Sequence, residues 1–364
     1  MARDTAAGRA VGDVAQLSGN LGADPALAGI NPLQAGVSGA ATARRRVSGR
    51  RDNRLAYLFL APAIAILSVF HFFPLFFSLY ISLHNWRIRK VDFLGLANYT
   101  EALQKREFWL SLGNTVYYVI GTVPITMALA LFIAYLLFQK VKFLSFFRTV
   151  YFLPYITSSV AAAAIWTWIF NARTGVMNQL LGRVGVQLRW LLEPKGIFAM
   201  MADRFGLQLP TILAGPSLAL VAIMVVAVWH LIGFDIVIFL AGLGNINKEL
   251  YEAARIDGAS EWAIFRRITI PLLAPTISFL TIVSTIGAFK AFNEIYVMSI
   301  STGGNSGKAG NPLGSTQTVV VYVYNQFYSS QRLGYGSAVA FLLFAIIFAL
   351  TLLQLWYGRR REAV

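Results

Sequence analysis

The sequence contains no cysteine among its 364 residues, so a disulfide framework and a thiolate metal site are both excluded. Charged residues are also scarce: they make up 13% of the chain, against about a quarter in a typical soluble domain. The HExxH, GxSxG and Walker A motifs are missing, and no paired carboxylates stand out. These absences argue against a hydrolase or a nucleotide-binding enzyme, and we expect no catalytic site.

The charges that are present are mostly positive, with 31 basic and 16 acidic residues and a formal net charge of +15. One interpretation of such a chain is nucleic-acid binding. The basic residues, however, lie in loops between apolar stretches and not on one amphipathic face. Retention of Lys and Arg on the cytoplasmic side of a membrane produces the same bias. We favour this second interpretation and expect a lipid bilayer, not a nucleic acid, as the partner.

Apolar residues dominate the chain, at 57% of the total, and aromatic residues reach 14%. A helix needs roughly 20 apolar residues to cross the bilayer core. Six stretches are long enough, which predicts an all-α polytopic membrane protein with six transmembrane helices. The predicted spans are 56–82, 114–138, 149–170, 216–242, 273–298 and 336–357.

The first 54 residues differ from the rest, because they are rich in Ala and Gly and end in a cluster of arginines. A segment of this composition buries too little apolar surface to offset its chain entropy, so 1–54 is predicted to be a disordered basic tail. It is too long and too polar for a signal-peptide n-region, and the first span is expected to remain as an uncleaved start-transfer helix. The transmembrane domain is then 55–357, followed by a short C-terminus at 358–364.

Orientation follows from the basic residues near the span ends. Arginines flank both the first and the last span, so both termini are expected in the cytoplasm. The loops at 139–148 and 243–272 then face the cytoplasm as well. The loops at 83–113, 171–215 and 299–335 face outward, and the second of them is long enough to hold a short interfacial helix.

The loop between the fourth and fifth predicted spans, 245–275, has an organisation of its own. Asn247 is suited to cap a short helix, and Gly258 permits a tight bend after it. Ser260 is suited to cap a second helix, whose last turns carry Arg266 and Arg267 where cations suit the dipole. A simple connection could be much shorter. These residues alone leave two interpretations open, a docking element for a partner protein and an interfacial helix lying on lipid.

Here the sequence resembles a known family. Glu252-Ala-Ala, Asp257-Gly-Ala, Phe265, Ile268 and Pro271 match the EAA loop of ABC importer permeases. The resemblance implies a type I ABC importer permease fold with a core at about 110–357, in which 245–275 is a cytoplasmic coupling loop. It also implies that one set of side chains contacts the ATP-binding subunit. These residues are Glu252, Ala253, Ala254, Asp257, Gly258, Ala259 and Phe265.

Other segments resemble the carbohydrate branch of that family, the permeases for maltose, lactose and glycerol phosphate. They include Phe93–Tyr99, Leu240–Leu243 and Gly334–Gly336. The resemblance implies a bacterial cytoplasmic membrane protein that forms a heterodimer with a second related permease. It implies an ATP-binding subunit dimer and an extracytoplasmic sugar-binding protein as further partners. No cofactor is expected on this chain, since ATP and Mg would bind the partner ATPase.

Charges inside the predicted spans are costly and invite explanation. Lys290 and Glu294 lie four residues apart and could pair on one helix face. The alternative is that they line a sugar path, where sugars need hydrogen-bond partners and aromatic faces. The candidates for this path are Trp229, Phe289, Phe292, Asn293, Glu294 and Tyr296.

Two further polar residues lie in the fourth predicted span. Asp235 is expected to make an interfacial or coupling-loop contact, and His230 a hydrogen bond to a neighbouring helix. If either residue, or Glu294, relayed protons, the chain would be an ion-coupled secondary transporter of a small polar solute. Such transporters often carry internal repeats, and none is evident here.

Overall fold

A computed structural model describes residues 51–138, 143–210, 213–300 and 308–362. Most of the predicted disordered tail therefore lies outside the described residues. Residues 51–54 belong to the first turn of helix α1 (Arg51–Leu67), so the helix begins earlier than the predicted boundary. The chain divides into two compact units between Val69 and Phe70.

The first predicted span, 56–82, corresponds to a membrane-spanning candidate at Tyr57–Ser82. It comprises α1, a π-helical turn at Ser68–Phe72 and helix α2 (Phe73–Ser82). None of its most apolar 18-residue window is buried within the chain. Such a helix is stable where lipid or another protein covers its apolar side chains.

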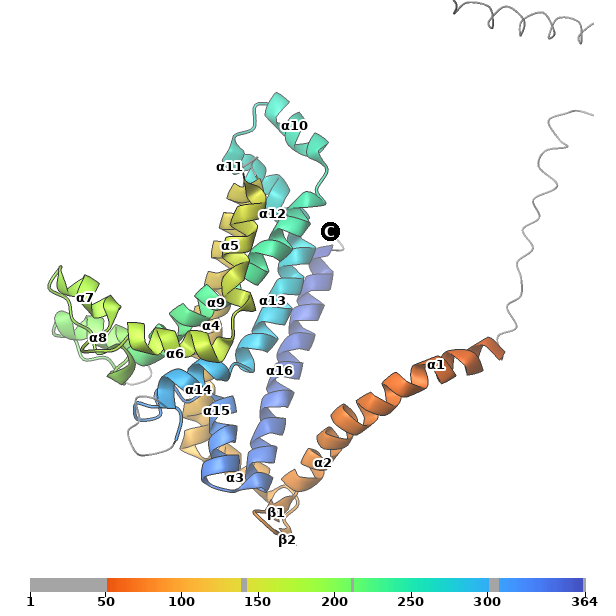
Figure 1. Ribbon diagram of the computed structural model, residues 1–364, viewed down its shortest axis with the longest axis vertical. Helices are drawn as coiled ribbons and strands as arrows, with labels where there is room; N and C mark the ends of the chain where they lie inside the picture. The colour runs from red at the N-terminus through yellow and green to blue at the C-terminus, as the bar shows by residue number, and fades with distance from the viewer. Residues whose placement is uncertain (1–50, 139–142, 211–212, 301–307, 363–364) are drawn as a thin grey trace, which may run out of the picture. The chain divides into compact units, whose positions relative to one another are not determined.

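The second unit is built on four long helices (Figure 1). The central helix α9 is apolar on every side, and just over half of its most apolar window, 56%, is buried. It packs along α4 and α5, while α13 packs against α4 and α16. The four long helices are α4 (Arg106–Phe138), α9 (Leu218–Gly244), α13 (Ala274–Phe289) and α16 (Leu333–Glu362). The shorter helix α5 (Leu144–Ile156) follows α4 in the chain.

Close approach of α9 to α5 depends on Gly233. A Cβ atom at this position would lie 2.1 Å from the carbonyl oxygen of Tyr151. Small residues allow the backbones of membrane helices to approach in this way, and the resulting packing stabilises the pair. The contact fixes how α9 is rotated against its neighbour.

The third predicted span, 149–170, is not one straight helix. The structure has α5 followed by α6 (Ser159–Ile169), bent by 91° at the break between them. Thr157 and Ser158 leave the helical conformation, and the Ser158 side chain caps α6 by accepting a hydrogen bond from the Ala161 N–H. The capping Ser therefore starts a new helix in the middle of the apolar stretch. The described residues hold five long spans, or six if this bent pair is one span.

The fifth predicted span, 273–298, corresponds to a candidate span at Ala274–Ile300, but it is interrupted. Helix α13 ends at Phe289, and helix α14 (Asn293–Ile300) starts after three residues. Lys290 closes α13 with its N–H bonded to the carbonyls of the last turn. The break therefore places polar residues, among them Lys290 and Asn293, within the candidate span.

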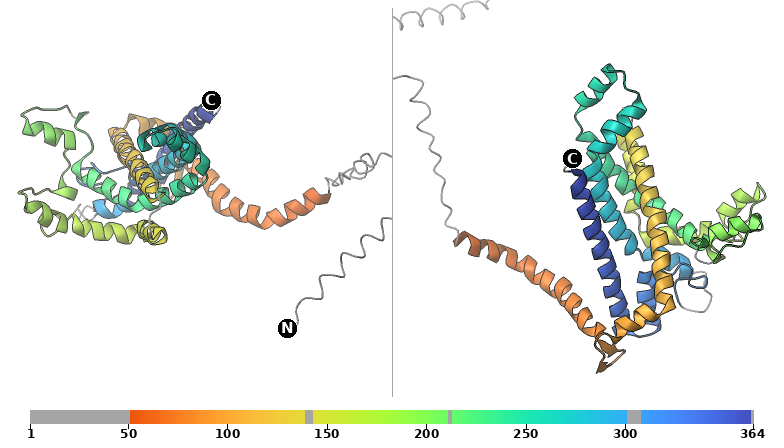
Figure 2. Two further views of the ribbon diagram at one scale, coloured as in Figure 1. Left: turned by 90° about the horizontal axis from the view of Figure 1, so that it is seen from above. Right: turned by 180° about the vertical axis from the view of Figure 1, so that it is seen from behind.

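Both ends of the second unit carry smaller elements (Figures 1 and 2). At one end lies the loop between α9 and α13, near the C-terminal end of α16. At the other end lie a hairpin, a departure from an all-α chain, and helix α3. The 171–215 loop projects from the side of the unit and contains a short helix, α8; its interfacial location stays a prediction. The short elements of the second unit are β1 (His84–Trp86), β2 (Lys90–Phe93), α3 (Ala97–Gln104), α7 (Val176–Gly182), η3 (Trp190–Leu192), α8 (Ile197–Arg204), α15 (Val319–Tyr324) and η7 (Asn325–Ser329).

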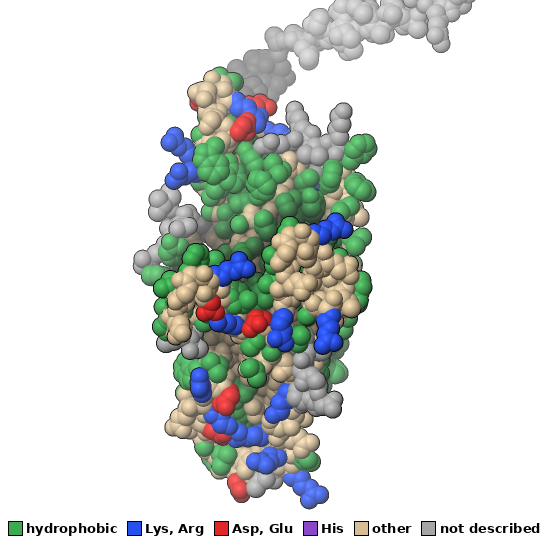
Figure 3. Space-filling view, turned by 90° about the vertical axis from the view of Figure 1, so that its left-hand side faces the viewer, with side chains coloured by type: hydrophobic (Ala, Val, Ile, Leu, Met, Phe, Trp, Pro, Cys, Tyr) green, Lys and Arg blue, Asp and Glu red, His purple; other side chains and the backbone are tan. Residues whose placement is uncertain are grey.

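On the face toward which α7 and α8 point, hydrophobic and charged side chains lie at different levels along the long axis (Figure 3). Hydrophobic side chains form a broad patch below the tip of the α9–α13 loop. Lys and Arg are more frequent toward the middle and the opposite end of this face. An apolar band of this kind is what a bilayer core requires.

Candidate functional site

The α9–α13 loop (residues 245–273) forms the predicted helix–bend–helix. Helix α10 (Lys248–Ile256) is capped by Asn247, whose Oδ1 accepts a hydrogen bond from the Glu249 N–H at 3.0 Å. This confirms the predicted cap. Tyr251 anchors the helix, because its ring is buried and its hydroxyl lies 3.3 Å from the Thr269 hydroxyl.

The bend after α10 has the geometry that its glycine predicts. Gly258 has a backbone φ of +79°, and its N–H donates to the Arg255 carbonyl at 3.1 Å. The next N–H, of Ala259, donates to the Ala254 carbonyl at 2.9 Å. These two bonds make a Schellman motif, which ends a helix through a left-handed residue. A Cβ on Gly258 would meet no other atom within 4 Å, so the backbone angle alone demands glycine.

The second half of the loop begins at Ser260, whose hydroxyl accepts a hydrogen bond from the Ala263 N–H at 3.3 Å. Glu261 lies in the first turn and bonds to Arg255 at 3.0 Å across the bend. Its carboxylate raises the pKa of the exposed Arg255 guanidinium above its usual range. The segments that follow are α11 (Glu261–Ile264), the π-helical η5 (Phe265–Thr269) and α12 (Ile270–Leu272).

The residues predicted to contact an ATPase separate into two groups by exposure. Four are exposed on the projecting loop, namely Glu252, Ala253, Asp257 and Gly258. The other three are half-buried, namely Ala254, Ala259 and Phe265. Both alanines pack against the apolar core below the loop. Sequence reasoning missed Ile256, an apolar side chain that is 86% exposed at the tip.

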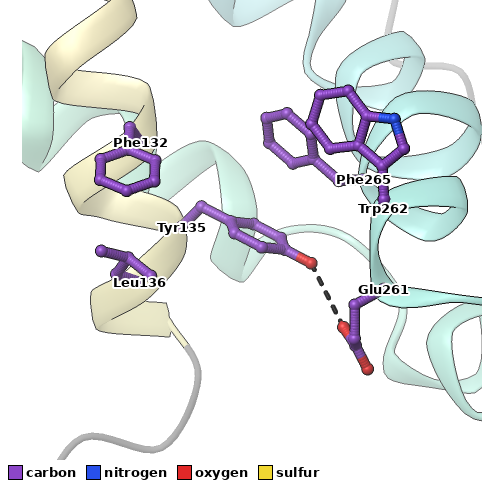
Figure 4. A pocket seen from close by; sticks show the side chains of 6 residues that line it. All are labelled: Phe132, Tyr135, Leu136, Glu261, Trp262 and Phe265. Carbon is purple, nitrogen blue, oxygen red and sulfur yellow. Dashed lines mark hydrogen bonds between the residues drawn. The ribbon is translucent and has the colours of Figure 1, made fainter.

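A groove of about 230 Å³ separates the end of α4 from the second half of the loop (Figure 4). The Tyr135 hydroxyl reaches across it and donates to the Glu261 carboxylate at 3.4 Å. The Tyr135 and Phe265 rings lie 4.7 Å apart, and Phe265 stacks on Trp262. The aromatic side chains Trp262 and Phe265 therefore face α4, and this contact links the loop to a long membrane helix.

A second, larger cavity of about 580 Å³ lies among the membrane helices, and we call it the membrane cavity. Its walls come from α4, the α5–α6 bend, α9 and the break between α13 and α14. Polar side chains alternate with apolar ones around it. The polar lining comprises Tyr118, Thr122, Thr126, Tyr155, Ser159, His230, Asp235, Ser284, Lys290, Asn293 and Glu294.

Lys290 and Glu294 both line the membrane cavity, but no ion pair joins them in the described chain. Their spacing would bring them together on a continuous helix. The break after Phe289 removes that continuity, since Lys290 closes α13 and Glu294 lies in the first turn of α14. Asn293 instead ties the break to α6 by donating a hydrogen bond to the Ser159 hydroxyl at 2.8 Å.

Three of the six residues predicted for the sugar path line the cavity: Phe292, Asn293 and Glu294. Tyr296 lies behind the wall, with its ring stacked on Phe292 at 5.0 Å. Phe289 and Trp229 do not line it. Phe289 is buried in a core cluster with residues of α3, α4, α15 and α16, and the Trp229 ring packs edge-on against Trp166 at 5.5 Å.

The polar residues of α9 differ from expectation. Asp235 is 2% exposed and lines the membrane cavity, so it does not make the expected interfacial contact. His230 is also buried, and its Nδ1 lacks the expected hydrogen bond to a neighbouring helix. Sequence reasoning also missed the α4 wall, where Tyr118, Thr122 and Thr126 recur every four residues on one face. That spacing was a signal that could have been found.

Among the described residues no group of three or more His, Asp or Glu side chains could hold a metal ion. The candidate site is a polar membrane cavity joined, through α9 and α13, to an exposed loop.

Comparison with known proteins supports a transport component. Residues 126–363 match the family model described as the binding-protein-dependent transport system inner membrane component. The chain is 33% identical over 326 residues to the lactose transport system permease protein LacF of Rhizobium radiobacter, covering 88% of this chain and 100% of that one. It is 32% identical over 315 residues to the trehalose/maltose transport system permease protein MalF of Thermococcus litoralis, covering 86% and 96%.

A solved structure shares the fold. A chain of the bacterial alginate ABC transporter in complex with an alginate-bound periplasmic protein superposes with a TM-score of 0.68. The sequence identity is 20%, and the match covers 85% of this chain and 96% of that chain. The family match spans the last part of α4, all but three of the residues that line the membrane cavity, and the α9–α13 loop. This chain therefore belongs to the family of inner-membrane permease components of binding-protein-dependent ABC transport systems.

Proposed function

We propose that this chain is one of two permease subunits of an importer that moves a carbohydrate across the cytoplasmic membrane by alternating access. One observation carries the proposal. The exposed α9–α13 loop joins two helices, α9 and α13, that together supply nine of the twenty residues lining the membrane cavity. A protein that moved this loop would pull on both walls of the cavity.

The permease itself performs no catalysis and binds no cofactor, since in this family ATP is hydrolysed by a separate subunit. Two copies of that subunit would grip the loops of the two permeases. ATP binding would draw the loops together and open the cavity outward. The exposed loop residues Glu252, Ala253, Asp257 and Gly258 are available for this contact. Ala254, Ala259 and Phe265 would support it from below.

The proposed orientation places the α9–α13 loop and both termini in the cytoplasm. The basic clusters beside the first and last spans favour this topology. The position of the α16 C-terminus near the loop agrees with it. The opposite end, with α3 and α15, would then meet an extracytoplasmic binding protein. In this scheme 1–54 is a cytoplasmic tail, 55–357 is the permease domain and 358–364 is a cytoplasmic C-terminus.

Carbohydrate is the proposed cargo because the similar proteins include permeases for lactose and for trehalose and maltose. The membrane cavity suits such a solute. It combines hydroxyl, amide and carboxylate groups with the Phe292 ring, which Tyr296 holds in place. We propose Phe292, Asn293 and Glu294 as direct contacts. Tyr296 supports them, and Trp229 and Phe289 would contact sugar only in another conformation.

The test is uptake into proteoliposomes that contain the complete transporter. We expect accumulation of a radiolabelled neutral sugar only with ATP inside and the binding protein outside. An ATPase subunit without its catalytic glutamate should abolish accumulation. Uptake that persists with this inactive ATPase, and that collapses with a protonophore, would instead establish an ion-coupled secondary transporter.

A further inference from the structure

Two buried polar atoms on α9 lack protein partners. Oδ2 of Asp235 and Nδ1 of His230 make no hydrogen bond to any part of the chain that the structure describes. The two residues are only 2% and 8% exposed. Buried polar groups in native proteins are nearly always satisfied, so each exception calls for a specific explanation. Both side chains line the membrane cavity, where a bound molecule can supply the missing partner.

The helix that carries these residues is held firmly. Gly233 lies between them and places the α9 backbone directly against Tyr151 of α5. Rotation of α9 would drive that contact into a clash. The two unpartnered atoms are thus fixed in the cavity wall, as a preorganised binding site requires.

The charges that line the cavity are unequal in number and in depth. Two carboxylates, Asp235 and Glu294, face one cation, Lys290. Lys290 is exposed, whereas Asp235 is buried. No arginine, the residue best suited to bind carboxylate or phosphate groups, is among the described residues of the lining. Charges interact more strongly where water is excluded, so the buried carboxylate dominates the interior.

We infer that Asp235 makes the cavity selective for uncharged carbohydrates, accepting hydrogen bonds from their hydroxyl groups and repelling carbohydrates that carry carboxylate or phosphate. His230 supports the same preference as a second acceptor for a hydroxyl. The inference rests on the proposed function and adds the charge class of the cargo. It also predicts a cargo unlike the acidic polysaccharide alginate of the similar solved transporter.

The experiment uses the complex purified with its partner subunits but without binding protein. Any preference between the two sugars then comes from the permeases alone. The probe is the neutral sugar that the complete transporter imports best from a panel of lactose, maltose, trehalose and maltotriose. Its counterpart is the same sugar oxidised to a carboxylate at a primary alcohol carbon. Equilibrium dialysis of both radiolabelled compounds gives the ratio of their dissociation constants.

We expect wild type to bind the neutral sugar at least tenfold more tightly than its carboxylate. Asp235→Asn should lower this ratio at least threefold, because it removes the charge and keeps the shape. Asp235→Glu should preserve the ratio. Asp92→Asn makes the same chemical change at an exposed site in β2, and it should leave the ratio unchanged. If Asp235→Asn is not recovered from membranes, Ser284→Lys is used instead. It adds a cation to the lining and should lower the preference for the neutral sugar over its carboxylate.

Two results would overturn the inference while leaving the proposed function intact. One is equal or tighter binding of the carboxylate by wild type. The other is an unchanged ratio in both Asp235→Asn and Ser284→Lys. A complete transporter that imports none of these sugars, or any other carbohydrate, with ATP would instead refute the proposed function.

Discussion

Gly258 holds a backbone conformation that other residues adopt only under strain. Its φ of +79° costs about 1–2 kcal/mol for a residue with a Cβ. Proline cannot adopt it, because its ring locks φ near −65° and removes the N–H that bonds to the Arg255 carbonyl. The bend is exposed and no neighbour fills the space around it. Substitution here should alter the loop without disturbing the membrane helices.

We therefore predict that Gly258→Pro reaches the membrane in normal amounts but loses ATP-dependent uptake at least tenfold. Gly258→Ala should retain part of the activity. Immunoblotting of membranes and uptake in proteoliposomes check the two effects separately. Gly206→Pro is the matched control, since Gly206 has a φ of +69° in an equally open turn after α8. Normal uptake by Gly258→Pro would show that the bend is not needed to couple the ATPase to transport.

At the scale of elements, helix α3 is tied to the start of α16 by a charged cluster. The Arg332 guanidinium donates to both carboxylate oxygens of Glu101, at 2.8 and 2.6 Å, and Lys105 bonds to the same carboxylate. Arg332 also lies over the Tyr335 ring, 4.4 Å from its centroid. The hydrogen bond from Arg332 lowers the pKa of Glu101 below its usual range.

This shift has a definite sign. A carboxyl group whose pKa is lower in the folded state stabilises the fold above its unfolded pKa, and the contribution disappears as pH falls through the folded value. We predict that Glu101→Gln lowers the melting temperature of the purified protein at pH 7. The difference from wild type should shrink as pH falls below the ordinary glutamate pKa of about 4.3, and it should vanish only below the lowered pKa of Glu101. Both partners are about a third exposed, so the effect should be no more than about 1 kcal/mol. A difference that is independent of pH would rule out the ion pair as its source.

Local signals were sufficient to predict the elements of the α9–α13 loop. The caps at Asn247 and Ser260 and the bend at Gly258 depend only on residues within a few positions. A short stretch of sequence is therefore enough to predict them. The 91° bend between α5 and α6 was not predicted, because Ser158 lies in an apolar stretch that has the length of a span. Composition measures length and apolarity, and it does not detect one capping hydroxyl.

The cavity was only partly predictable for a similar reason. Phe292, Asn293 and Glu294 follow from their chemistry and depth. Phe289 was assigned to the same path by helical spacing, but the break after it ends that spacing and leaves its ring in a different core cluster. Which face of α9 borders the cavity depends on the contact of Gly233 with α5, a tertiary fact that the sequence of α9 does not reveal.

At the scale of the whole molecule, the second unit leaves an apolar side chain uncovered on its projecting loop. Ile256 is exposed at the tip of the α9–α13 loop. Such exposure is expected of one subunit taken from a larger membrane assembly. Glu252 lies close to that tip on α10 and is exposed, so its charge is available to a partner.

We predict that Glu252→Lys weakens assembly with the ATPase and leaves insertion of the chain unchanged. Reversing a charge at a complementary interface places like charges together, and a tenfold loss of affinity needs only about 1.4 kcal/mol. The measurement is the amount of ATPase that copurifies with a tagged permease from solubilised membranes, which should fall roughly tenfold at low salt. Glu193→Lys, just after η3 and outside the α9–α13 loop, reverses a charge equally and should copurify normal amounts. Because added salt screens exposed charges, the deficit should change with ionic strength. Equal yields for both variants at every salt concentration would mean that the partner grips another surface.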